Sequence, residues 1–216
     1  MKNRGMILVT GLVLLTAVSL LAVTAARGTG LAYRQASNLE DEFQALAGAR
    51  RAEADARTWL MSRPDIERET DCIQNCLLPP AVHSAGTLPY NPAYESAAWW
   101  DLHGHRAGTN PVSGVTVEQE SADNNASLWV MEEIHFETMQ AGASETAVGA
   151  VAYYRVISRG TGKRSRSVVL TETLLARPWQ GDYTAGSFPA TAGTADFCAQ
   201  FSLETPCGTV AWRRLR

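Results

Sequence analysis

The residues with the clearest chemistry in this chain are four cysteines, which form two pairs that are close in sequence. Cys72 and Cys76 make one pair, and Cys198 and Cys207 make the other. In an exported protein such cysteines form disulfide bonds. Four cysteines allow three pairings, and we favour the two local ones, Cys72–Cys76 and Cys198–Cys207, because each closes a short loop. The alternative is a metal or redox site at Cys72 and Cys76, but no second Cys/His pair with zinc spacing accompanies them.

The other polar residues do not form a catalytic or metal-binding pattern. His103 and His105, with His83 nearby in sequence, could bind a metal, but no pair of carboxylates stands beside them. Glu132 and Glu133 have no matched acid–base partner. The motifs of phosphate-binding loops, dinucleotide sites, zinc proteases and serine hydrolases are absent. We therefore expect no enzyme activity, no metal ion and no cofactor.

Composition limits the class of protein further. The chain has 216 residues, 19 Lys and Arg, 22 Asp and Glu, and a formal net charge of −3. Such a length fits one domain with an additional segment. A slightly acidic chain lacks the basic surface that nucleic-acid binding requires, so we expect no nucleic-acid partner.

The N-terminal part of the chain predicts a membrane-spanning helix. Met6 to Ala26 contains no charged residue in 21 positions, and about 20 such residues cross the hydrocarbon core of a bilayer. Lys2 and Arg4 precede this segment, so its N-terminal end should face the cytoplasm. The alternative is a cleaved signal peptide with small residues at 22–26, but the apolar run is longer than is usual there.

The helical pattern continues beyond this span. No proline occurs from Leu31 to Ser62, and Pro64 ends the pattern. Apolar residues recur at three- and four-residue steps and form one stripe, which should pack against the rest of the protein: Leu39, Phe43, Leu46, Ala49, Ala52, Ala56 and Leu60. A helix over residues 6–62 would be roughly 85 Å long at about 1.5 Å per residue. Gly28 and Gly30 should be a point of flexibility in it.

The remainder of the chain predicts an antiparallel sheet. Residues 64–125 are rich in Pro, Gly, Asn and Ser and should form an ordered irregular region. Strand patterns follow at 128–134, 148–158 and 167–175, and Gly160 to Lys163 has the composition of a hairpin turn. One face of such a sheet must be buried, and the apolar stripe of the helix is the available partner.

Three segments carry a resemblance to a known family. Lys2-Asn3-Arg4-Gly5-Met6 before an uncharged span resembles the leader of type IV pilins and type II secretion pseudopilins. The resemblance is greatest to the PilX-type minor pilins, and it is carried by Arg4-Gly5-Met6, by the segment from Leu39 to Ala56 and by residues 153–162, with the sequence YYRVISRGTG. The resemblance covers roughly residues 1–62 and 126–178. It implies an α+β, pilin-like fold, in which a long N-terminal helix packs on a three- to four-stranded antiparallel sheet.

The resemblance also implies a processing reaction and a set of partners. A prepilin peptidase would cut between Gly5 and Met6, and Met6 would become the methylated N-terminus. The chain would then consist of a leader (1–5), a transmembrane half-helix (6–26), an amphipathic half-helix (27–63), the irregular region (64–125) and a sheet with a C-terminal disulfide loop (126–216). The partners would be inner-membrane lipid before assembly, the prepilin peptidase, other minor pilins and the major pilin.

One position departs from the family pattern. Most pilins have Glu at the fifth position of the mature chain, and this chain has Thr10 there. In the family that carboxylate is thought to meet the N-terminal amine of a neighbouring subunit, and a lone carboxylate at membrane depth is costly. The pseudopilin at the tip also lacks this acid. Thr10 therefore suggests a subunit that no other pilin precedes, although simple drift at one apolar-run position is the alternative.

These observations favour a minor pilin that starts type IV pilus assembly and stays at or near the pilus tip, with a possible role in adhesion. It would lie in the inner membrane, with its C-terminus in the periplasm, before assembly. Two alternatives remain open: a type II secretion pseudopilin, and an exported binding module with a conventional signal peptide. The last of these would have a mature N-terminus near residue 26 or 27.

Overall fold

A computed structural model describes residues 4–69, 77–88, 92, 95–114, 127–138, 149–163, 167–179, 197–201 and 203–216. The described elements, in chain order, are α1 (Arg4–Met61), a 3-10 turn (Asp65–Glu67), β1 (Val82–His83), α2 (Ala97–His103), β2 (His105–Arg106), β3 (Leu128–Thr138), β4 (Ala150–Thr161), β5 (Val168–Trp179) and β6 (Gly208–Arg214). The chain divides into two compact units, Met1–Asp41 and Glu42–Arg216. The first unit is helical throughout its described part.

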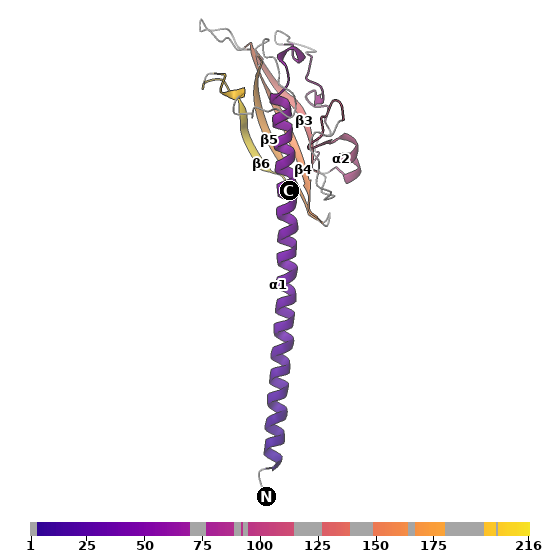
Figure 1. Ribbon diagram of the computed structural model, residues 1–216, viewed down its shortest axis with the longest axis vertical. Coiled ribbons are helices and arrows are strands. Elements are labelled where there is room, and N and C mark those ends of the chain that lie inside the picture. The colour runs from indigo at the N-terminus through magenta and orange to yellow at the C-terminus, as the bar shows by residue number, and fades with distance from the viewer. Residues whose placement is uncertain are drawn as a thin grey trace. The chain divides into compact units, whose positions relative to one another are not determined.

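The second unit is a mostly antiparallel sheet with a helix on one face. The strand order is β1-β3-β4-β5-β6, with β2 also paired to β3. The pairs β3–β4, β4–β5 and β5–β6 are antiparallel, whereas β1 runs parallel to β3. In Figure 1 the last turns of α1 cross the sheet in front of β4 and β5. This arrangement confirms the α+β, pilin-like fold.

The strands alternate between two apolar layers, because successive side chains of a strand point to opposite faces. On the α1 face, Tyr154 and Val156 of β4 pack with Ala56 and Trp59 of α1. On the other face, Ile157 packs in a second cluster with Trp100 of α2, Leu88, Leu128, Val130 and Leu170. The sheet is therefore covered on one face by α1 and on part of the other face by α2 and the segment before it.

The strands extend beyond the sequence patterns that predicted them. β4 continues to Thr161, so Gly160 belongs to the strand and not to the hairpin turn expected over Gly160–Lys163. The N–H of Gly162 donates to the carbonyl of Ser167 at 2.8 Å, which closes the β4–β5 connection just after the strand. The two-residue strands β1 and β2, and the C-terminal strand β6, had not been expected from the sequence.

Candidate functional site

The first unit presents an apolar helical surface. Its large side chains are exposed, with Leu8 at 74% and Leu15 at 69%. By length and composition α1 is the one helix in the described part of the chain that could cross a membrane. An apolar surface of this size needs lipid or other apolar helices as its surroundings.

Hydroxyl groups in this segment are compatible with such surroundings. Thr16 donates to the carbonyl of Val13 at 2.8 Å, and Ser19 donates to that of Leu15 at 2.7 Å. Thr24 and Thr29 make equivalent bonds one turn back. In an apolar medium an unpaired hydroxyl is costly, and these bonds pair each of the four hydroxyls within the helix itself.

The residues predicted for processing lie at the beginning of α1. The helix begins at Arg4, so Gly5 and Met6 are in its first turn, where only the backbone is described. Thr10 is exposed one turn further on. The helix also continues through Gly28 and Gly30, where flexibility had been expected, and the space around both glycines is open.

The part of α1 in the second unit packs through small side chains. Ala45, Ala49, Ala52 and Ala56 are fully buried and lie at steps of four, three and four residues. Trp59 and Leu60 continue this face toward the helix end. Alanine keeps the helix backbone close to the sheet, because its side chain adds only one carbon atom.

The four large residues predicted to carry this packing differ in how far they are buried. Leu60 is buried and Leu46 is partly buried against Ala45 and Ala49. Phe43 is 68% exposed, and Leu39, in the first unit, is 54% exposed. The apolar stripe predicted from the sequence includes the large residues at 39 and 43. The observed packed face is instead centred on the alanines.

The closest approach of helix and sheet is at Gly160. A Cβ atom built on Gly160 would lie 2.0 Å from the carbonyl oxygen of Ala45 and 2.3 Å from the nitrogen of Ala49. Gly48 faces it, and a Cβ there would lie 3.3 Å from the Cα of Gly160. Gly160 is the glycine of the Arg159-Gly160-Thr161-Gly162 segment, so this segment holds α1 in contact with β4 backbone to backbone.

A buried arginine holds the segment that follows α1. Arg177 of β5 is fully buried and donates to the carbonyl of Arg63 at 2.5 Å and to Asp65 at 3.2 Å. Its guanidinium lies 3.3 Å from the ring centroid of Trp179. Arg63 lies two residues after Met61, where α1 ends, and Asp65 begins the next turn. Arg177 therefore joins the segment that follows α1 to the sheet.

Further polar contacts fix the helix and its flanking segment to β3. Asp55 of α1 accepts from the indole N–H of Trp129 at 2.9 Å and from the N–H of Gly108 at 3.1 Å. Glu133 accepts two bonds from Arg68, at 2.7 and 3.0 Å. Burial raises the pKa of Glu133, and Arg68 opposes this rise. These bonds satisfy polar groups that the packing of α1 removes from water.

The comparisons with known proteins point to the same N-terminal segment. Residues 4–55 match the family model described as PilX N-terminal. This indicates a PilX-type pilin. No curated protein and no solved structure matches the chain.

The matched family is that of minor pilins of the type IV pilus, a structural and non-enzymatic family, and the match covers about a quarter of this chain. Pilins associate with other pilins, and the single apolar N-terminal helix is consistent with the single-pass membrane anchoring typical of them. The two ends of the matched range have different roles in the structure. Its beginning is the exposed apolar surface of the first unit, and its end holds the alanines that pack on the sheet.

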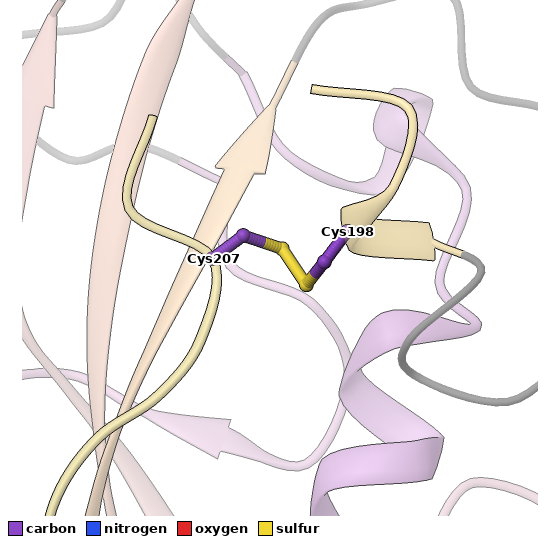
Figure 2. The surroundings of a disulfide bond; sticks show 2 residues. All are labelled: Cys198 and Cys207. Carbon is purple, nitrogen blue, oxygen red and sulfur yellow. A yellow bond between two sulfur atoms is a disulfide. The ribbon is translucent and has the colours of Figure 1, made fainter. Parts of the chain in front are cut away.

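A disulfide in the C-terminal part of the chain joins Cys198 and Cys207 (Figure 2). Cys207 comes directly before β6, so the bond ties the start of this strand to the short helical turn at 197–198. The favoured pairing is confirmed for these two residues. Cys72 and Cys76 lie outside the described residues, so their pairing stays a prediction.

Removal of this disulfide should weaken the sheet edge. We expect the double variant C198S/C207S to lose about 2–3 kcal/mol of unfolding free energy, because the oxidised bond constrains a short loop of the unfolded chain. Chemical denaturation of the full chain in detergent micelles measures this loss. The control compares wild type and variant under reducing conditions, where every disulfide is open and the two stabilities should agree. Equal stability of oxidised and reduced protein would contradict the expectation.

His103 and His105 both lie in aromatic contacts. His103 stacks on Trp99 with centroids 4.8 Å apart, and His105 lies 4.8 Å from Trp129. Burial lowers the pKa of His105, and nearby His83 lowers it further. Among the residues that the structure describes, no three His, Cys, Asp or Glu side chains are grouped so as to hold a metal ion.

Sequence reasoning missed the residues that fix α1 to the sheet. Gly48 and Gly160 carry a signal that could have been used, since both are glycines inside regular elements, where glycine is unfavourable without a close contact. Arg177 and Asp65 carry no such signal, because they are 112 positions apart and each resembles a surface residue in its own segment.

Proposed function

We propose that this chain is a minor pilin that primes type IV pilus assembly and remains at or near the tip of the fibre, where it could contribute to adhesion. The observation that carries the proposal is the apolar surface of the first unit. Exposed leucines and valines along α1 require lipid before assembly and other pilin helices after it. The match of residues 4–55 to the PilX N-terminal family supports the same role.

The mechanism follows from this surface. The apolar helix anchors the precursor in the inner membrane, and cleavage after Gly5 by the prepilin peptidase frees an uncharged helix that begins at Met6. This helix packs with the helices of other minor pilins, and the resulting bundle lowers the barrier to adding the first major subunits. The second unit holds the C-terminal part of α1 against its own sheet.

Thr10 supports the position at the tip. A carboxylate at this position in other pilins is thought to meet the N-terminal amine of a neighbouring subunit, and a threonine cannot form that ion pair. A subunit without the acid is best accommodated where no earlier pilin offers an amine. Thr10 is exposed on the helix surface, as a residue facing neighbouring subunits would be.

The test replaces the gene with variants. It measures cleavage of the leader, the number of pili and the position of the protein in the fibre. We expect the wild-type chain to have Met6 as a methylated N-terminus only in cells with prepilin peptidase, to restore pili, and to be labelled by immunogold at fibre ends. Gly5→Leu should stay uncut and should fail to restore pili. Thr10→Glu should be processed normally but should shift the label away from the ends.

Each alternative gives a different result. A mature N-terminus near residue 26 or 27 means a conventional signal peptide and overturns the proposal. Normal pili in a strain without the chain, with loss of type II secretion, means a pseudopilin. If the Thr10→Glu variant is still labelled at the tip, the missing acid no longer supports a position at the tip.

A further inference from the structure

The strand β6 ends the described sheet with an open edge. β6 is the last strand in the order β1-β3-β4-β5-β6, and six of its seven residues are exposed. Figure 1 shows it on the outer side of β5. On the other side of the sheet, β3 is instead flanked by β1 and β2. An open edge offers unpaired backbone groups to another strand.

The register shows which backbone groups of β6 are available. Leu215 donates its N–H to the carbonyl of Leu170 at 2.8 Å, and the register continues with Glu172 opposite Arg213. Hydrogen-bonded and non-hydrogen-bonded pairs alternate along an antiparallel ladder. Arg213 therefore bonds to β5, whereas the N–H and C=O groups of Trp212 and Arg214 point away from β5, toward the open edge.

The side chains of β6 guard this edge only in part. Natural edge strands are protected by proline, by charged side chains, especially lysine, or by β-bulges. β6 contains no lysine or proline, and its register shift against β5 lies between Thr209 and Ala211, before Trp212. Its two arginines are held back on the protein itself, Arg213 by Glu172 at 2.8 Å and Arg214 by Glu42 at 2.6 Å. Val210 and Trp212 remain 53% and 44% exposed.

The surroundings of the edge favour an acidic, partly apolar partner. Four arginines lie on β6, after it or against it, namely Arg50, Arg213, Arg214 and Arg216, whereas two glutamates, Glu42 and Glu172, form ion pairs with Arg214 and Arg213. A cavity of about 330 Å³ extends over the sheet from β3 to β6. Its apolar lining is Ile134, Leu174, Ala211 and Trp212, and its charged lining is Arg155, Glu172 and Arg213. It gives an apolar side chain of an added strand a place to bind.

We propose that the open edge of β6 binds an extended segment of a partner protein, with alternating acidic and apolar side chains, by β-strand addition. Backbone hydrogen bonds to Trp212 and Arg214 would provide the affinity, and the arginines and the cavity would select the side chains. This surface lies on the sheet and not on the apolar helix that carries the proposed function, so either proposal can fail without the other.

The test uses the full chain in detergent micelles and a capped peptide of alternating Glu and Val residues. A peptide of alternating Lys and Val residues is the matched control. We expect the acidic peptide to slow amide hydrogen exchange at Trp212 and Arg214 by about tenfold or more at saturation, since these two N–H groups become hydrogen-bonded. Unchanged exchange at both amides, or equal protection by the Lys peptide, would overturn the proposal.

A pair of variants separates the backbone from the side chain. Arg214→Ala and Arg214→Pro both remove the contact with Glu42, but only the proline removes the outward N–H. We expect Arg214→Ala to keep the protection of Trp212 and Arg214→Pro to lose it. Equal binding by both variants would contradict strand addition.

A charge variant keeps the test valid if the proline variant does not fold. Val210→Glu adds a carboxylate to an exposed position of the edge and leaves the backbone unchanged. It should weaken the acidic peptide and strengthen the Lys peptide, each by several-fold. Protection of Trp212 that rises with protein concentration without any peptide would mean that the occupant is a second copy of this chain, and would also overturn the proposal.

Discussion

Gly160→Ala should unfold or severely destabilise the second unit, although it adds one methyl group to a strand. The added Cβ would lie 2.0 Å from the carbonyl oxygen of Ala45 and 2.3 Å from the nitrogen of Ala49. These are backbone atoms of a helix, so no side-chain rotation relieves the contact. Moving α1 away from β4 would open the alanine-lined layer. We expect a loss of about 3 kcal/mol or more of unfolding free energy.

Gly48→Ala is the matched control for this prediction, because it adds the same methyl group on the helix side of the contact. Its Cβ would lie 3.2 Å from the hydroxyl of Ser127 and 3.3 Å from the Cα of Gly160. Neighbouring atoms can move by the few tenths of an ångström that this needs, and alanine is the better helix former by about 1 kcal/mol. The variant should therefore change stability by about 1 kcal/mol at most.

The measurement is chemical denaturation of the full chain in micelles, followed by the near-ultraviolet circular dichroism of the buried tryptophans. Trp59, Trp129 and Trp179 are all fully buried in the layer between α1 and the sheet, and Trp100 is buried on the other face, so most of this signal reports the packing of the α1 layer. Equal stability of Gly160→Ala and Gly48→Ala would show that α1 does not approach β4 this closely in solution.

The fold and the contact that stabilises it differ in how far the sequence predicts them. A period of two predicts β3 to β5, and three- and four-residue steps predict the helix, because these signals depend only on which side chains face a core. The predicted centre of the packed helix face differs from the observed one, because Leu39 and Phe43 have more apolar surface than Ala45 and dominate the sequence pattern. The sequence signal of a close approach between two backbones is the presence of small residues. This signal is weaker than the signal of large buried side chains.

Long-range contacts explain the remaining differences. Local composition predicts a turn at Gly160. Its contact with Ala45 and Ala49 joins positions far apart in the chain, so local composition does not indicate it. β6 was not expected, because its short apolar stretch is followed directly by the arginines at 213 and 214. Local composition predicts where a strand can form, but only the register with β5 shows that this one lies at the edge.

The pair formed by Arg177 and Asp65 gives the second large effect. Both side chains are buried, at 0% and 1% exposure, and Arg177 also bonds to the carbonyl of Arg63. Removal of one partner of a buried pair leaves an uncompensated charge in a medium that solvates it poorly. We expect Arg177→Met and Asp65→Leu each to lose about 3–5 kcal/mol of unfolding free energy.

The double variant Arg177→Met with Asp65→Leu distinguishes the cost of an uncompensated buried charge from a general loss of packing. Both charges are then absent, so the double variant should lose clearly less than the sum of the two single losses. The exposed pair of Arg214 and Glu42, with side chains 42% and 45% exposed, is the control. Single variants there should lose about 1 kcal/mol or less, because solvent screens such pairs. If the losses at Arg177 and Asp65 add fully, each residue contributes by packing alone, and the segment that follows α1 is not held by this ion pair.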